Sequence, residues 1–528
     1  MTAKAIAHGW VEQHKLQLSE WHRLIWDMAE PAWREYRSAA WFVECLRREG
    51  FEVEAGSGGM PTAFAARWSN GRGPTVAGYA EYDAVPGNCQ AAATRRGPRP
   101  GLSEFAPGHT DPHSALGIGA LAGILAAKHA MQAAGVNGTL KFFGEPAEKV
   151  QGSKLVHGLR GYYDGLDAIV SYHPFYMLPL CNTTRWDTHC GAYSSRIYSF
   201  ICDAPETWPA AASDSPIAAA HSAARAPGAN VSLFTMYSLT KATTESMLAH
   251  TGGWSLNEAI LTAGQATADN LPAHIAQINY AWRAPEVRMA DAILEVLDRN
   301  AEHAAAVGHC RLVKRWVSRT RPGVANHVLA DLTYRNLAEV GAPRYGRDAI
   351  ALARELQVNL GLKPLANPFL PACEALIDPR EAERKLREQM PAWQTNWTSD
   401  DYVEMTWYAP TVRLYIARPM LAVPAGYGGY PAWVANALGG LSPCIDPTIQ
   451  VAGKTIAGTL IDLLTQPQLL AAARAEHSER TSGARHLAPL LPADFAPPID
   501  YRWPEYATTA RGADWWIPRA ADLEPAGS

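Results

Sequence analysis

The sequence contains no run of lysine or arginine, no closely spaced cysteine pair and no apolar stretch long enough to cross a bilayer. Its basic residues are scattered and the formal net charge is -4, which argues against a nucleic-acid partner or an anionic membrane surface. The longest apolar stretch, residues 114–127, is shorter than the roughly 18 residues that a membrane-spanning helix needs. We therefore expect no membrane association, and a small molecule or a protein as the binding partner.

The 8 cysteines are dispersed through the chain and form neither a C-x-x-C motif nor a dense disulfide framework. This spacing is typical of reduced thiols in a cytosolic protein. The first twenty residues carry scattered charges and no apolar core before a small-residue cleavage site, so we expect no signal peptide. Together these features predict a cytoplasmic protein.

The chain is too long for one small domain, since 528 residues exceed the usual domain length of about 150 several times over. Helical and apolar strand patterns alternate through the first part, which predicts an α/β fold around a mixed or parallel sheet. From about residue 191 the pattern changes to alternating strands and an alanine-rich stretch, which indicates a smaller α+β insert. We expect domain segments at 1–190, 191–320 and 321–528, the last ending in a tail on the surface.

The periodicity of apolar residues and the caps predict the individual elements. Helices are expected at residues 10–28, 38–50, 112–135, 287–308 and 454–477. Strands are expected at residues 51–56, 62–68, 75–83, 139–144, 167–174, 194–205, 273–282 and 411–417.

Acidic and imidazole side chains follow several of the predicted strands. Glu81 and Asp83 end one strand, Glu145 and Glu148 follow another, and His173 lies at the end of a third. Ligands of open α/β sheets bind in the crevice beyond the carboxyl ends of the strands.

A fourth segment adds to this cluster, because His109, Asp111 and His113 alternate just before a predicted helix. Each residue alone has a simpler explanation, such as a hydrogen-bonded histidine or an aspartate that caps a helix. Acids and imidazoles that converge from four segments instead favour a divalent metal, with a carboxylate to deprotonate its water.

Six segments resemble, in order, motifs of the M20 family of metallopeptidases and amidohydrolases, nearest the branch that contains aminobenzoyl-glutamate hydrolase. They are GFEVEAGSGGMPTAFAARW with GYAEYDAVPG, GHTDPHSALGIGAL, FFGEPAEKVQGSK, YYDGLDAIVSYHP, DNLPAHIAQINYAWRAP and SDDYVEMTWYAPTVRL. The resemblance covers residues 30–470. It implies a zinc-peptidase-like catalytic domain with a mixed central sheet, interrupted by a smaller α+β lid domain through which the protein forms a homodimer.

The resemblance also implies roles for individual residues. Asp111, His113 and His173 fall on metal ligands of the family. Glu148 falls on the glutamate that acts as general base on the bound water, and Asp83 on the carboxylate that orients the site from behind.

Two departures from the family pattern concern the same metal of its two-metal site. Lys149 replaces the second glutamate of the Glu-Glu pair, and Tyr430 lies near the position of the late ligand histidine. We therefore expect one divalent ion per chain, zinc or manganese, with the Lys149 ammonium in place of the other cation's charge. A lysine among carboxylates stays charged through pairing.

A third departure concerns the lid, because residues 202–216 lack the histidine that polarises the scissile carbonyl in the family. His221, His189 and Asn270 are alternatives between which the sequence does not decide. Asn270, Glu145, Tyr430 and Trp407 are the candidate substrate contacts.

Tryptophan is abundant, with 18 residues. Some, such as Trp21 and Trp41, fall in ordinary helix positions, but others fall in the lid, the hinge or segments that face the site. Aromatic walls suit a flat apolar ligand. The tryptophans in question are Trp186, Trp208, Trp282, Trp407 and Trp433.

These features predict a metal-dependent hydrolase of a C–N bond, most simply an amide of an aromatic or N-acyl amino acid type. A hydrolytic deaminase of an aromatic amine is an alternative on the same fold, and it would release ammonia. A pseudoenzyme or small-molecule binding protein that lost one metal site is the alternative from another class.

Overall fold

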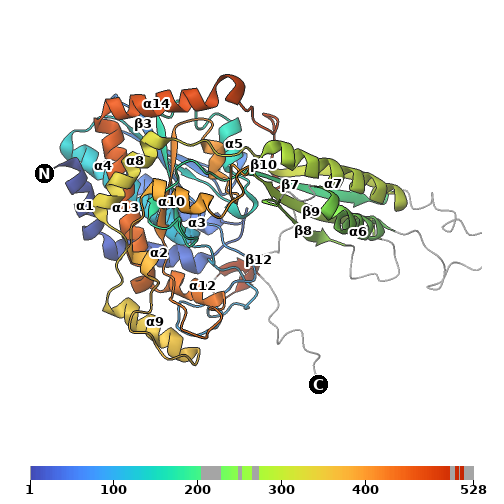
Figure 1. The fold of residues 1–528 in the computed structure, drawn as a ribbon, viewed down its shortest axis with the longest axis horizontal. Helices are drawn as coiled ribbons and strands as arrows, with labels where there is room; N and C mark the ends of the chain where they lie inside the picture. Colours follow the sequence, from blue (N-terminus) through green and yellow to red (C-terminus); the bar gives the residue numbers. More distant parts are fainter. Residues whose placement is uncertain are drawn as a thin grey trace, which may run out of the picture.

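The computed structural model describes residues 2–203, 228–247, 252–263 and 273–499, and the backbone of 506–509 and 512–515. Figure 1 shows a larger body of helices around a sheet and a narrower arm that extends from one side of it. The arm is formed by the middle of the chain. The larger body is therefore assembled from the segments before and after the arm.

The larger body contains a seven-stranded sheet with the strand order β1-β2-β4-β3-β5-β11-β6. Strands β4, β3, β5 and β11 are parallel, whereas β1, β2 and β6 run antiparallel to their neighbours. Every residue of β5 and β11 is buried, as is typical of parallel strands in an α/β sheet. The expected α/β fold with a mixed central sheet is confirmed. The strands are β1 (Glu52–Ala55), β2 (Phe64–Ser69), β3 (Thr75–Ala80), β4 (Thr139–Gly144), β5 (Ala168–Phe175), β6 (Thr183–Thr184) and β11 (Thr411–Ala417).

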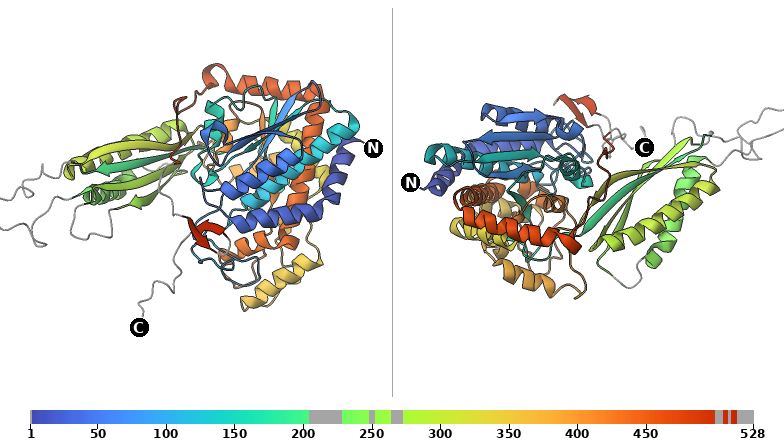
Figure 2. Two further views of the ribbon diagram at one scale, coloured as in Figure 1. Left: turned by 180° about the vertical axis from the view of Figure 1, so that it is seen from behind. Right: turned by 90° about the horizontal axis from the view of Figure 1, so that it is seen from above.

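Helices surround this sheet in Figures 1 and 2. The α-helices of the larger body are α1 (Ala3–Gln13), α2 (Lys15–Met28), α3 (Tyr36–Arg48), α4 (His113–Ala134), α5 (Lys154–Leu159), α8 (His327–Val340), α9 (Arg347–Asn359), α10 (Pro379–Arg387), α11 (Tyr402–Met405), α12 (Trp433–Gly440), α13 (Ser442–Thr465) and α14 (Pro467–Thr481). Short 3-10 turns are η1 (Ser57–Gly59), η2 (Glu148–Val150), η5 (Pro371–Glu374) and η6 (Gly483–Arg485).

Two expected helices are each two helices in the structure. Residues 10–28 span the end of α1 at Gln13 and the start of α2 at Lys15. The apolar pattern over residues 454–477 continues across Pro467, but α13 ends at Thr465 and α14 begins at Pro467. Gln466 between them has φ -122° and ψ 78°, which lies outside the helical region. Proline lacks the N–H that would continue α13, and it is well suited to the first position of a new helix.

Helix α4 lies in the core of the larger body, and every residue from His113 to Ala127 is buried. It is long and apolar enough to cross a membrane, but 89% of its most apolar window of 18 residues is buried inside the protein. The helix approaches α13 closely at Gly123. A Cβ atom there would lie 2.5 Å from Cγ2 of Ile456. The absence of a side chain at Gly123 therefore lets the middle of α4 pack directly against α13.

The arm is a four-stranded antiparallel sheet with the order β10-β7-β9-β8. Helices α6 and α7 lie along one face of it (Figure 2), and buried side chains such as Tyr280 and Trp282 fill the space between. We call this unit the lid. It consists of β7 (Ala192–Ile201), α6 (Ala229–Met247), β8 (Ser255–Thr262), β9 (Ile275–Ala284), α7 (Val287–Val307) and β10 (Arg311–Thr320).

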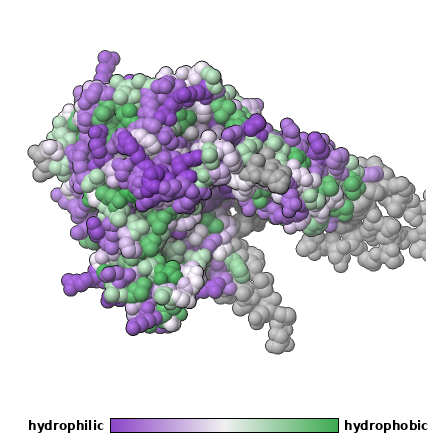
Figure 3. Space-filling view, viewed as in Figure 1, coloured by the Kyte–Doolittle hydropathy of each residue, from purple (hydrophilic) through white to green (hydrophobic). Residues whose placement is uncertain are grey.

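The C-terminal segment that we expected to form a surface tail lies mostly outside the described residues. Within it, β12 (Tyr506–Thr509) pairs antiparallel with β13 (Gly512–Trp515). On the side seen in Figure 1, polar side chains cover much of the larger body, and apolar ones appear in smaller groups between them (Figure 3).

We expect Gly123→Val to destabilise the protein, because its side chain would overlap Ile456 in the contact between α4 and α13. Overpacking of this kind costs about 1–3 kcal/mol, and differential scanning calorimetry should show a lower Tm. Gly9→Ala in α1 is the matched control, because nothing lies within 4 Å of its new Cβ and alanine favours a helix. An unchanged Tm for Gly123→Val would contradict the close packing.

Candidate metal centre

The candidate site lies where the parallel strands of the large sheet end. Glu81 and Asp83 follow β3, His173 lies near the end of β5, and His113 is the first residue of α4. Because β3 and β5 are parallel neighbours, their carboxyl ends meet at one edge of the sheet. The polar residues that the sequence placed at separate strand ends are thus brought into contact.

The two histidines are oriented so that their Nε2 atoms face the site. Nδ1 of His113 lies 2.6 Å from Oδ1 of Asp83, and Nδ1 of His173 lies 2.6 Å from the carbonyl oxygen of Pro174. Both partners accept a hydrogen bond, so each Nδ1 carries the proton. Metal-binding histidines are commonly fixed in this way by a carboxylate or a carbonyl behind them.

Two carboxylates face the same pair of imidazoles. Oε2 of Glu81 lies 3.3 Å from Nε2 of His113, and Oδ1 of Asp111 lies 3.6 Å from Nε2 of His173. Among the described residues, neither oxygen has a hydrogen-bond partner, although both atoms are buried. Ligand atoms of Glu81, His113 and His173 lie within 4.8 Å of one another. Unpaired buried oxygens beside two imidazoles fit a divalent cation.

A second group of possible ligand atoms contains the Lys149 ammonium. Asp111, His113 and Glu148 also bring one ligand atom each within 4.8 Å. Nζ of Lys149 lies 2.7 Å from Oδ2 of Asp111, 2.9 Å from Oε2 of Glu148 and 3.1 Å from Nε2 of His113. The ammonium therefore contacts all three members of this group.

The charges in the site determine the protonation of each group. Burial and Lys149 oppose the charged form of His113, but Asp83 and Glu81 outweigh them and raise the pKa of His113 well above its ordinary value. Burial lowers the pKa of His173 to about 4, so this imidazole is neutral at pH 7. A cation at Nε2 of His113 would displace its proton, as metal binding ordinarily does.

Glu148 and Lys149 are both ionised at neutral pH. Burial alone would raise the pKa of Glu148, but Lys149 and His113 lower it to about 2. Burial would lower the pKa of Lys149, but Asp111 and Glu148 raise it well above the ordinary value. Glu148 is thus a carboxylate that can accept a proton at the mouth of the site, where its side chain is 12% exposed.

A layer of buried ion pairs lies beneath these groups. Nζ of Lys154, at the start of α5, lies 2.7 Å from Oε1 of Glu81 and 2.6 Å from Oδ1 of Asp401, and all three side chains are fully buried. Next to them, Arg413 on β11 pairs with Asp400. The sequence placed Glu81 in the acidic cluster at the strand ends but gave it no role of its own, and it did not point to Lys154 or Asp401, although each lies within one of the M20-like segments.

Four residues that were expected in the site have hydrogen-bond partners in other parts of the protein. Glu145 accepts hydrogen bonds from His157 and Tyr163 behind the site. The Tyr430 hydroxyl bonds to Gln357 and to the carbonyl of Ala422. Trp407 donates its indole N–H to the carbonyl of Pro322, and His109 contacts the carbonyl of Ile25. None of these contacts involves the two histidines.

Of the three residues that could replace the missing lid histidine, the structure describes His189. This side chain is buried, and its Nδ1 lies 2.8 Å from the hydroxyl of Tyr402. Asn270 and His221 lie outside the described residues, as does Trp208.

Two of the tryptophans expected to line an aromatic pocket have other partners. Trp282 is fully buried in the core of the lid and donates to the carbonyl of Ala290. Trp186 stacks on His327 with a centroid distance of 3.8 Å, and Arg380 lies over the Trp186 ring.

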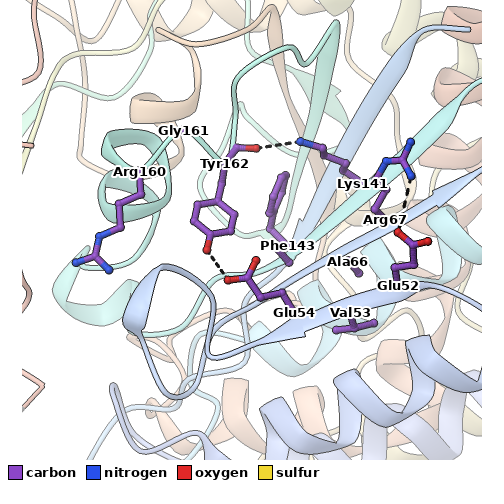
Figure 4. Close-up of a pocket in the computed structure, with 11 residues that line it drawn as sticks. Glu52, Val53, Glu54, Ala66, Arg67, Lys141, Phe143, Arg160, Gly161 and Tyr162 are labelled. Atoms are coloured by element: carbon purple, nitrogen blue, oxygen red, sulfur yellow. Dashed lines mark hydrogen bonds and ion pairs between the residues drawn. The ribbon is translucent and has the colours of Figure 1, made fainter.

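Two cavities lie outside the histidine cluster. One, of about 570 Å³, is lined by loop residues 87–90, 96–98 and 104–105 together with Trp433 and Asn436 of α12. The other, of about 620 Å³, lies over β1, β2 and β4. In Figure 4 Tyr162 and Phe143 line this second cavity, and Tyr162 points toward Glu54. The residues that line it contribute nothing to the candidate metal ligands.

Comparison with known proteins identifies similar hydrolases, although no family model matches the chain. One of the subunits of the p-aminobenzoyl-glutamate hydrolase of Escherichia coli (strain K12) is 25% identical over 480 residues, which are 88% of this chain and 93% of that protein. The aminobenzoyl-glutamate utilization protein from Klebsiella pneumoniae has a TM-score of 0.52 at 14% identity, over 86% of this chain and 97% of that one.

A dinuclear metal binding peptidase of the M20 family from Bacillus subtilis has a TM-score of 0.46 at 13% identity, over 86% of this chain and 99% of that one. The Escherichia coli relative confirms the resemblance read from the motifs, and the Klebsiella structure confirms the fold. Over nearly its whole length, this chain is similar to a hydrolase of the aminobenzoyl-glutamate branch.

Proposed function

We propose that this protein hydrolyses an amide bond with one divalent ion, zinc or manganese, held by Asp111, His113 and His173. The observation that carries the proposal is the pair of imidazoles whose Nε2 atoms face buried, unpaired carboxylate oxygens, with Glu148 beside them. When bound, the ion lowers the pKa of a water ligand and polarises the substrate carbonyl.

The residues of this chain supply the rest of the reaction. Glu148, ionised and next to the ligands, takes the proton of the attacking water and returns it to the leaving nitrogen. Asp83 holds the His113 ring through the hydrogen bond to Nδ1, and its other oxygen accepts the backbone N–H of Lys149 at 2.8 Å. Asp83 therefore positions both a metal ligand and the turn that carries the base.

An amide of an aromatic or N-acyl amino acid type is the proposed substrate. The relative that matches 88% of this chain is named for p-aminobenzoyl-glutamate, which has this chemistry. A screen of aryl amides, N-acyl amino acids and aryl amines distinguishes the amidase, which releases a carboxylate and an amine, from a deaminase, which releases ammonia.

We expect Glu148→Gln to retain fold and metal but to lose about 10²–10⁴-fold in kcat on the best substrate of that screen, because general base catalysis contributes this much. Steady-state kinetics and elemental analysis are the measurements. Glu52→Gln, a change of an exposed side chain on β1, is the control. A rate near that of the wild type for Glu148→Gln would refute the assigned role. A protein that binds metal but releases no product from any substrate would favour the binding-protein alternative.

We further propose that the Lys149 ammonium takes the place of a second ion. Its contacts to Asp111, Glu148 and His113 support this, since they supply a positive charge among the same three groups. We expect inductively coupled plasma mass spectrometry to find one tightly bound ion per chain after loading with zinc or manganese. Two tightly bound ions per chain would contradict the substitution, and His173→Ala should reduce the content of the single site.

We also propose that the lid forms a homodimer. Strand β8 is an edge of the lid sheet, and exposed apolar side chains include Phe234 on α6 and Ile260 on β8. Unpaired strand edges and apolar patches favour pairing with a second copy. Light scattering coupled to size exclusion should give twice the chain mass, and Ile260→Lys should reduce it toward the monomer. A monomeric wild type at micromolar concentration would refute the proposal, and Leu16→Lys on α2 is the control.

A further inference from the structure

We propose that Glu81 is a fourth protein ligand of the same ion and that Lys154 holds it with one oxygen turned toward the metal. The inference rests on the proposed function. It deepens that proposal by extending the ligand set from one carboxylate to two and by assigning a role to the buried lysine beneath the site.

The position of Glu81 is that of a ligand in three respects. Its side chain is fully buried directly after β3, its Oε2 atom lies 3.3 Å from Nε2 of His113, and that oxygen has no hydrogen-bond donor among the described residues. One ligand atom each from Glu81, His113 and His173 lies within 4.8 Å of the others. A buried carboxylate oxygen without a donor is costly, and a cation between these atoms would remove the cost.

Lys154 limits which oxygen of Glu81 can bind. Its Nζ lies 2.7 Å from Oε1 and is held from the other side by Asp401 at 2.6 Å, while the Tyr79 ring lies 4.9 Å away. This fully buried ammonium forms one ion pair with Oε1 and another with Asp401, so Oε1 faces a positive charge, although neither Glu81 oxygen accepts a hydrogen bond within the described residues. Oε2 remains the oxygen available to a metal.

Asp111 is held in the same manner by the other lysine. Nζ of Lys149 lies 2.7 Å from Oδ2 of Asp111, while Oδ1 is unpaired and lies 3.6 Å from Nε2 of His173. Each of two carboxylates thus has one oxygen bound by an ammonium and one oxygen beside an imidazole. Two imidazole nitrogens and two single carboxylate oxygens are ligand types that zinc binds, and a fifth position would remain for the water of the proposed reaction.

The competing explanation is that Glu81 is only the buried partner of Lys154 and does not contact the ion. In that case a neutral glutamine would weaken the protein but leave metal affinity unchanged. If Glu81 is instead a ligand, the loss of its charge weakens metal binding directly. The metal affinity of Glu81→Gln therefore distinguishes the two explanations.

The experiment measures zinc affinity by competition with a chelator in the full-length protein and in three variants. We expect Glu81→Gln to weaken binding at least about 100-fold, since changes behind the ligands already cost about 10–100-fold. Glu81→Asp, which keeps the charge but shortens the reach, should give an intermediate loss. Glu404→Gln is the matched control, because Glu404 is likewise buried and paired with a cation, Arg321, and it lies outside both candidate ligand groups. Its affinity should stay within about threefold of the wild type.

A second measurement remains valid even if the variants differ in stability. The visible absorption spectrum of the cobalt-loaded protein reports the ligands directly, so it should change in Glu81→Gln and remain that of the wild type in Glu404→Gln. Wild-type affinity and an unchanged cobalt spectrum in both Glu81 variants would overturn the inference. Loss of turnover in Glu148→Gln would still support the proposed function in that case, whereas failure of the wild type to bind zinc or cobalt would overturn both.

Discussion

The carboxylate of Asp83 connects the two halves of the candidate site. One oxygen accepts the proton of His113 at the start of α4, and the other accepts the backbone N–H of Lys149 in the turn after β4. The turn and the helix come from different parts of the chain, and this side chain at the end of β3 fixes the distance between them. Without it, the Nδ1 proton of His113 and the backbone N–H of Lys149 would both lose their acceptor.

The site is also defined by closely packed buried charges. Glu81, Asp111 and Glu148 face inward, and Lys149, Lys154 and the protonated His113 lie among them as cations. Burial raises the pKa of Glu81 to about 7 and that of Asp401 well above its ordinary value, so protonation neutralises part of the negative charge when no metal is bound. Buried ions are stable only when paired, so a cation between the imidazoles would allow these carboxylates to stay ionised.

Much of the fold could be predicted from the sequence, because periodicity and caps act locally. The helix expected from Pro112 to Gly135 is α4, and Gly135 ends it in the left-handed conformation. The strand motif with His173 and the helix start with Asp111 and His113 could also be placed at one sheet edge. For this prediction it was sufficient that the carboxyl ends of parallel strands meet at one edge of the sheet.

The direction of individual side chains could not be predicted in the same way. Glu145 and Glu148 lie in one short segment, but only Glu148 faces the histidines, whereas Glu145 points to His157 and Tyr163. The register of β9 directs the Trp282 side chain into the lid core. The role of Lys154 depends on Asp401, which is remote in sequence. These outcomes depend on tertiary contacts that no local pattern reports.

The pairing of β5 with β11 sets an order for the formation of the site. His173 on β5 lies opposite Tyr415 on β11, and the whole lid is encoded between these two strands. The lid has its own core, so it can form as a unit while the central sheet still lacks a strand. During synthesis, therefore, the strand that carries the candidate ligand His173 lacks its β11 partner until residues 411–417 have emerged.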